Sequence, residues 1–157
     1  MAFLGIFAYC GIYGEYYGLV QTSDEYYNVT NMADAWIYNT NFDNASIDEI
    51  SDFTTQTERQ LVIQSVADFD NKPDITLHFA EKGEISKFYS TEGKDFDASD
   101  DSGVWLDKRF ADEKNLSVGD EITFEFNNIN ITKEIKGIGY SPEYIYESSP
   151  NSLTPDF

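Results

Sequence analysis

The chain has 157 residues, 41% hydrophobic and 16% aromatic, which is enough apolar material for a folded core and argues against disorder. Its 29 acidic and 10 basic side chains give a formal net charge of −19. Such a surface repels nucleic acid and anionic lipid headgroups, so we expect no nucleic-acid partner. Cys10 is the only cysteine, which excludes an internal disulfide and a Cys-rich metal site.

The chain begins with an apolar, uncharged segment. Residues 2–13 have the sequence AFLGIFAYCGIY, shorter than the ~20 residues that a bilayer-spanning helix needs. Tyr13, Tyr16 and Tyr17 follow where the polarity rises, as in the aromatic belt of a membrane interface. We therefore predict that residues 1–25 form the outer end of a transmembrane helix. The alternative is the first buried helix of a soluble domain.

Basic residues are missing from the first third of the chain. The first Lys or Arg is Arg59, and the residues before it include many acids, from Glu15 to Asp52. This asymmetry is what the positive-inside rule expects of a segment on the non-cytoplasmic side of a membrane. An ordinary acidic protein with unevenly placed charge is the alternative.

A strand followed by a short helix is predicted after the N-terminal segment. Residues 34–39 (DAWIYN) alternate like a strand. Ser46 and Glu49 have the spacing of a capping box, which predicts a helix from about residue 47. Three apolar residues have the spacing of one buried face of that helix: Ile47, Ile50 and Phe53.

Two further strands complete the first unit. Residues 59–69 are rich in β-branched side chains, residues 71–74 (NKPD) are turn formers, and residues 75–81 alternate as a second strand. Together with the preceding strand and helix, they predict a β-α-β-β unit over about residues 34–81.

The second half of the chain predicts shorter elements. A short strand is expected around residues 86–89, then a turn at Glu92-Gly93 and a loop over 97–103. The apolar residues 103–106 (GVWL) predict a buried strand, and a helix is expected to start near Asp107.

A β-hairpin is predicted near the end. Residues 121–126 alternate after a Gly119-Asp120 turn, and Asn127-Asn128 can adopt the positive φ angles of a two-residue hairpin turn. Gly137 and Gly139 are expected at a bulge or bend of the return strand, which Pro142 ends. These short strands suggest a small open barrel beside the first unit.

No residue pattern predicts catalysis or metal binding. His78 is the only histidine and lies within an alternating strand, without a second histidine or a paired nucleophile. The acidic residues of 95–101 resemble part of a calcium site but lack the Gly and Glu of an EF-hand loop, so we expect a solvated loop. We therefore expect no catalytic, cofactor-binding or metal-binding residues and no enzymatic activity.

Three stretches together resemble a known family. They are GIYGEYYGLVQTSDEYYNVTNMADAWIYN, then ISKFYSTEGKDFDASDDSGVWLDKRFADEKNLSVGDEITF, and finally IKGIGYSPEYIY. In order and spacing they resemble the first large extracytoplasmic domain of FtsX-like (MacB-type) ABC-transporter permeases, particularly those of Gram-positive bacteria. The resemblance runs from about Gly11 to Tyr146.

The resemblance implies an α+β fold with a mixed β-α-β-β core (porter-like, MacB periplasmic-core type) and a small antiparallel β-subdomain. The extracytoplasmic domain would span residues 26–147, with sub-units of about 34–85 and 86–147, and residues 148–157 would be a loose tail. Its function would be to relay ATP-driven conformational change to export, lipoprotein release or the control of cell-wall hydrolases. The implied partners are a cytoplasmic ATP-binding subunit, a second permease copy and an extracytoplasmic protein or peptide, with the domain outside the cell membrane.

Two other functional classes remain open. One is a secreted or anchored acidic binding module, adhesin-like or calcium-dependent. The other is a hydrolase that uses surface carboxylates, although no pair of acidic residues is singled out by the sequence.

Overall fold

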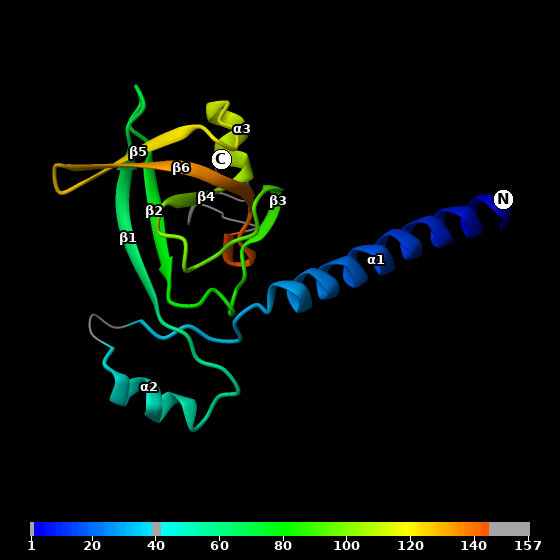
Figure 1. Ribbon diagram of the computed structural model, residues 1–157. Coiled ribbons are helices and arrows are strands. Elements are labelled where there is room, and N and C mark those ends of the chain that lie inside the picture. Colours follow the sequence, from blue (N-terminus) through cyan, green and yellow to red (C-terminus); the bar gives the residue numbers. More distant parts are fainter. Residues whose placement is uncertain (1, 39–41, 145–157) are drawn as a thin grey trace.

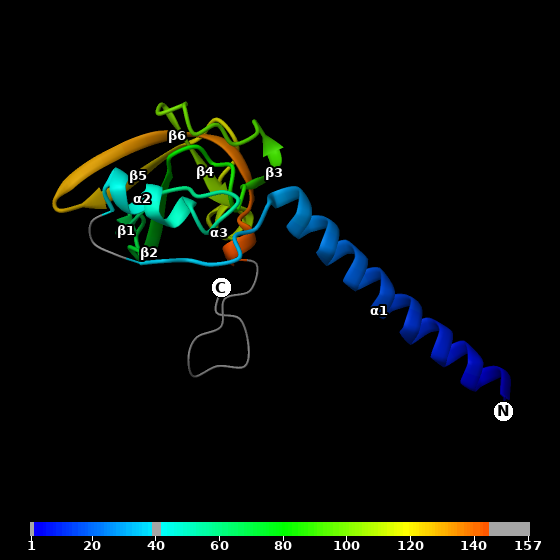
Figure 2. The same cartoon turned by 90° about the horizontal axis from the view of Figure 1, so that it is seen from below.

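A lone helix projects from a body built on one β-sheet (Figure 1; Figure 2). The computed structural model describes residues 2–38 and 42–144. The fold of this part is α+β, as predicted, with these elements: α1 (Ala2–Thr30), α2 (Asn44–Ser51), β1 (Gln60–Ala67), β2 (Asp74–Ala80), β3 (Tyr89–Gly93), β4 (Gly103–Asp107), α3 (Lys108–Lys114), β5 (Glu121–Phe126), β6 (Ile129–Tyr140) and the 3₁₀ turn η1 (Pro142–Tyr144).

All six strands belong to one sheet. Five follow the order β2-β1-β5-β6-β3 with antiparallel neighbours, and β4 pairs with β6 in parallel. β1 comes from the first predicted sub-unit and β5 from the second, and Ala67 lies opposite Phe124 in their pairing. The two predicted sub-units therefore share a sheet.

The β5–β6 hairpin follows its turn chemistry. Asn127 and Asn128 have φ angles of 50° and 62°, which suit the right-handed twist of a two-residue hairpin. Phe126 lies opposite Ile129 across this turn. The predicted hairpin is confirmed.

β6 is the strand around which the body is organised, because it pairs with β5, β4 and β3. Glycines allow its neighbours to approach: a Cβ on Gly139 would lie 2.0 Å from the Tyr89 carbonyl oxygen, and one on Gly137 would lie 2.5 Å from that of Lys94. The register with β4 shifts at this point, which confirms the predicted bulge. Ile135 and Ile138 are both buried although three residues apart.

The core is small and lies between the sheet and α3. Its buried members are Leu106, Ala111, Ile122, Phe124, Ile135 and Ile138. The Asp107 carboxylate accepts the Arg109 backbone N–H at 2.9 Å, which caps the start of α3. The predicted strand over 103–106 and the helix that follows it are confirmed.

Three predictions for the residues before β1 are wrong. No strand forms over the described residues 34–38; they cross the body as an extended segment, and the Trp36 indole donates to Glu143 at 3.0 Å. α2 is capped by Asp43 and not by Ser46, because the Asp43 carboxylate accepts both the N–H and the hydroxyl of Ser46. Phe53 is 87% exposed and Ile47 and Ile50 are half-buried, so α2 has no buried face.

The strand expected around residues 86–89 begins only at Tyr89. Ser86 has a φ of +49°, which is outside the β region. Its N–H donates to the Asn31 carbonyl instead of to a strand. The segment before Tyr89 therefore forms hydrogen bonds with the end of α1 and not with a neighbouring strand.

α1 leaves the body almost without contacts. Residues 3–25 are exposed on every side, so the alternative of a buried first helix is wrong. In the part of the chain that the structure describes, no helix has the length and apolar character needed to cross a membrane. The helix joins the body only near Tyr26 and Thr30 (Figure 1).

Candidate functional site at the helix–sheet junction

α1 ends in a fully formed C-terminal cap. Asn31 has the left-handed conformation, with φ at +49°. Its N–H donates to the Asn28 carbonyl at 3.3 Å, and the Met32 N–H donates to the Tyr27 carbonyl at 3.2 Å. These two bonds make a Schellman motif, in which asparagine replaces the usual glycine. The helix therefore has a defined end and a defined exit direction.

The body binds this helix end through its backbone. The Lys87 N–H donates to the Thr30 carbonyl at 2.7 Å, and the Ser86 N–H donates to the Asn31 carbonyl at 2.9 Å. Thr30 is 1% exposed, and its hydroxyl donates back to the Tyr26 carbonyl at 2.8 Å. Carbonyl groups that a helix end leaves free are thus paired with the body.

The Asn31 side chain joins three segments of the chain. Its amide donates to the Glu84 carbonyl at 2.8 Å and to the Gln56 side-chain oxygen at 2.9 Å. The Ala33 N–H also donates to the Ser86 hydroxyl at 3.2 Å. The end of α1, the loop before β3 and the segment before β1 are therefore connected at one residue.

Glu58 fixes the loop that receives α1. Its two carboxylate oxygens accept four successive backbone N–H groups, those of Lys82, Gly83, Glu84 and Ile85, at distances between 2.5 and 3.1 Å. Burial of the carboxylate acts to raise its pKa, but the four hydrogen bonds outweigh it and leave the pKa of Glu58 below its ordinary value. The carboxylate is thus charged at neutral pH and holds the loop in one conformation.

Aromatic contacts complete the junction. The rings of Tyr26 and Tyr89 meet edge to face, with their centroids 5.8 Å apart. Burial, followed by the neighbouring Tyr27 and Tyr89, raises the pKa of Tyr26. The Tyr26 and Ser90 hydroxyl oxygens are buried without a hydrogen-bond partner among the described residues. A buried hydroxyl without a partner carries a desolvation cost.

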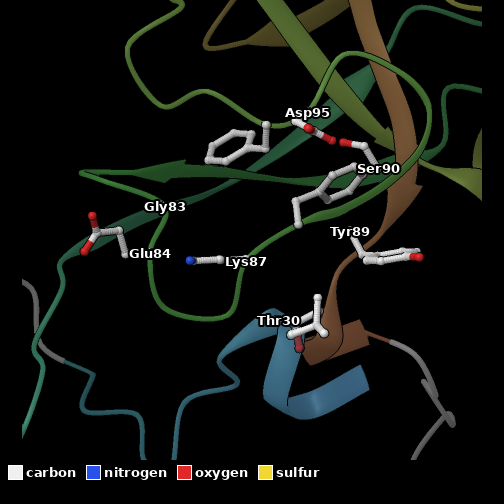
Figure 3. Close-up of a pocket in the computed structure, with 10 residues that line it drawn as sticks. Thr30, Gly83, Glu84, Lys87, Tyr89, Ser90 and Asp95 are labelled. Atoms are coloured by element: carbon white, nitrogen blue, oxygen red, sulfur yellow. The ribbon is translucent and has the colours of Figure 1, made fainter. Parts of the chain in front are cut away.

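A pocket opens between the helix end and β3 (Figure 3). Its cavity volume is about 580 Å³. The lining comes from the end of α1 (Val29, Thr30), the loop fixed by Glu58 (Gly83, Glu84, Lys87, Phe88), the start of β3 (Tyr89, Ser90) and the segment after it (Asp95, Phe96). The junction therefore surrounds a space that a small ligand could enter.

His78 lies elsewhere, on β2. Its Nδ1 is 2.9 Å from the Gln60 side-chain oxygen, and its ring packs edge to face on Tyr144 at 5.1 Å. Burial lowers the pKa of His78, an effect that the nearby Glu143 opposes. Nε2 is buried with no hydrogen-bond partner in the part of the chain described. This environment keeps the imidazole neutral and enclosed.

The acidic loop turns its carboxylates onto its own backbone. Asp97 accepts the N–H and hydroxyl of Ser99, and Asp100 accepts those of Ser102. These hydrogen bonds lower the pKa of both aspartates. Within residues 2–38 and 42–144, no three His, Cys, Asp or Glu side chains are grouped so that they could hold a metal ion.

The junction residues were not singled out from the sequence. Asn31 carried a usable signal, because an asparagine after a long helical run is a C-terminal cap candidate. Glu58 carried none, since its four partners lie 24 to 27 residues further along the chain.

Comparisons with protein-family models, with curated proteins and with solved structures found no match to this chain.

Proposed function

We propose that this chain is an extracytoplasmic domain of an FtsX-like (MacB-type) ABC-transporter permease, held outside the cell membrane. In this proposal it relays conformational change, driven by ATP hydrolysis in a cytoplasmic subunit, to export, lipoprotein release or cell-wall hydrolase control. A second permease copy and an extracytoplasmic protein or peptide would be its other partners. The finer fold assignment, a porter-like core with a small β-subdomain, belongs to the same proposal.

The observation that carries the proposal is the junction between α1 and the body. A relay needs a rigid element that moves together with the domain that it drives. α1 can act as this element, because its C-terminal end is capped and the carbonyls at this end accept hydrogen bonds from the Ser86 and Lys87 N–H groups. A displacement of α1 would reach β3 through the same loop that Glu58 fixes.

The surface of α1 supports a membrane-proximal position. Its exposed apolar and aromatic side chains include Phe3, Leu4, Phe7, Ile12, Tyr13, Tyr16 and Tyr17. Exposed patches of this kind mark protein or membrane contacts. The absence of basic residues before Arg59 favours the outer side of the membrane.

The rigidity of the junction can be measured directly. Cys10 is exposed on α1 and is the only cysteine, so it can carry a spin label without other changes. A second label at Glu121→Cys, at the start of β5, would report the distance between helix and body. We expect a narrow distance distribution that broadens in Asn31→Ala. A broad distribution in the parent protein would refute a relay, because a freely swinging helix transmits no motion.

The assignment to a transporter has a separate test. An affinity tag at the native gene would allow the protein to be purified from detergent-solubilised membranes. We expect an ATP-binding subunit to co-purify and to be identified by mass spectrometry. Recovery of the protein from the growth medium without such a subunit would refute the transporter and favour a secreted binding module.

A further inference from the structure

We propose that the pocket between α1 and β3 binds a short peptide with free termini and an aromatic side chain. This inference goes beyond the relay, because it assigns a ligand to the junction. Binding can be measured on the chain alone, so a failure of the transporter assignment and a failure of the pocket assignment are distinguishable.

The size and the apolar part of the pocket suit such a ligand. Its volume of about 580 Å³ lies within the range of small-molecule sites, ~300–1,000 Å³. Two phenylalanines, Phe88 and Phe96, line it and are half-buried. Phe96 is held in place by Trp105, with ring centroids 5.1 Å apart. An aromatic side chain of the ligand would pack against these rings.

The charged groups of the pocket are left unused by the protein. Glu84, Lys87 and Asp95 are exposed, and none makes an ion pair within the described residues. Six of the ten basic side chains are ion-paired: Arg59, Lys72, Lys108, Arg109, Lys114 and Lys136. In so acidic a protein, an unpaired lysine at a pocket is available to an anion from outside.

The positions of these charges define a ligand that carries both signs. Lys87 and Glu84 lie on one side of the pocket, whereas Asp95 and Ser90 lie on the other (Figure 3). A carboxylate would therefore pair with Lys87, and an ammonium with Asp95. Ser90 also lines the pocket, and its buried hydroxyl oxygen has no hydrogen-bond partner among the described residues. The overall negative field adds to the attraction for the ammonium.

Occupation of the pocket would tighten the junction. A bound peptide would contact the end of α1 and the β3 side together, because Thr30 and Ser90 both line the pocket. We expect slower hydrogen exchange at the Lys87 amide, which is bonded to the Thr30 carbonyl.

The probes are the dipeptide Ala-Phe and two blocked forms of it. N-acetyl-Ala-Phe lacks the ammonium, and Ala-Phe-amide lacks the carboxylate. Titrations are followed by amide chemical shifts of residues 83–90 in the full chain. We expect Ala-Phe to bind with a Kd of about 1 mM, and each blocked form to bind about two- to five-fold more weakly, as for exposed ion pairs.

Matched variants separate the charges. Lys87→Gln should weaken Ala-Phe binding by about two- to five-fold and leave the affinity for Ala-Phe-amide unchanged. Lys82→Gln, an exposed lysine that does not line this pocket, is the control and should change neither. Glu84→Gln should strengthen Ala-Phe binding, because it removes a negative charge from the side of the pocket where the ligand carboxylate would bind. Equal affinity for all three peptides, or no shift at ~10 mM Ala-Phe, would overturn the proposal.

Discussion

The substitution Glu58→Gln tests whether the Glu58 carboxylate fixes the loop that receives α1. Glutamine keeps one carbonyl oxygen but presents an NH₂ group where the second carboxylate oxygen accepted hydrogen bonds. Glu58 Oε1 accepts from Lys82 and Gly83, and Oε2 accepts from the two residues that follow. Two of the four backbone N–H groups would therefore face another donor. The loop from residue 82 to 85 should lose its fixed conformation.

The expected loss follows from the number of bonds. A hydrogen bond to a charged group contributes about 1.5–3 kcal/mol, so two lost bonds amount to ~3–6 kcal/mol. Water can reach this loop and replace part of them, which reduces the expected loss of unfolding free energy to ~2–3 kcal/mol. For a domain of this size, Tm should fall by about 5–10 °C. The measurements are urea unfolding and thermal unfolding at pH 7, and Glu84→Gln, at an exposed carboxylate without an ion pair among the described residues, is the matched control.

Acidification gives an independent signature. The folded-state pKa of Glu58 lies below the ordinary value of 4.5. Its stabilising contribution is therefore fully present above pH 4.5 and is lost as the pH falls through the lower folded-state pKa. The stability difference between the parent protein and Glu58→Gln should narrow in this window. A Tm unchanged at pH 7, or a difference that stays constant on acidification, would refute the reasoning.

Three other changes have defined outcomes. Asn31→Ala should lower the unfolding free energy by ~2–3 kcal/mol, because it removes two side-chain hydrogen bonds and places alanine at a positive φ. Denaturant unfolding measures the loss, and Asn28→Ala is the control. An equal loss in Asn28→Ala would contradict the prediction. Gly139→Ala should lower the unfolding free energy by ~3 kcal/mol or more, because its Cβ would lie 2.0 Å from the Tyr89 carbonyl oxygen. Gly14→Ala, where the added Cβ meets open space, is the control and should stabilise α1 by ~1 kcal/mol. A small effect of Gly139→Ala in thermal unfolding would mean that β3 does not lie this close to β6. Calcium chloride should raise Tm no more than magnesium or sodium chloride at equal ionic strength, because no three His, Cys, Asp or Glu side chains of the described residues are grouped so that they could hold a metal ion. A calcium-specific rise in Tm would support the calcium-dependent binding module.

Local signals in the sequence predicted local structure well. Alternation predicted β2 and β5, the content of β-branched residues predicted β1, and the paired asparagines predicted the β5–β6 turn. The apolar residues of 103–106 and the aspartate after them predicted β4 and the start of α3. These signals act over a few residues, and nothing distant competes with them.

The wrong predictions concern segments whose conformation is set by residues far away in the sequence. Residues 34–38 alternate like a strand but pair with no strand, and the Trp36 indole instead donates to Glu143, far along the chain. Asp43 and Ser46 are both good caps three residues apart, so the sequence alone could not rank them. The Glu58 clamp and the pocket join segments that only the folded chain brings together.

The central position of β6 determines when the protein can fold during synthesis. A chain leaves the ribosome from its N-terminus, so β1 to β5 emerge before the strand that joins most of them. The edges of β3, β4 and β5 that face β6 stay unpaired until the segments of residues 129–140 that they pair with are outside. α1 emerges before every strand of the sheet and exposes its aromatic side chains throughout this interval. Translation pauses before β6 would therefore prolong a state with open strand edges and an apolar helix, which is the state most prone to aggregation.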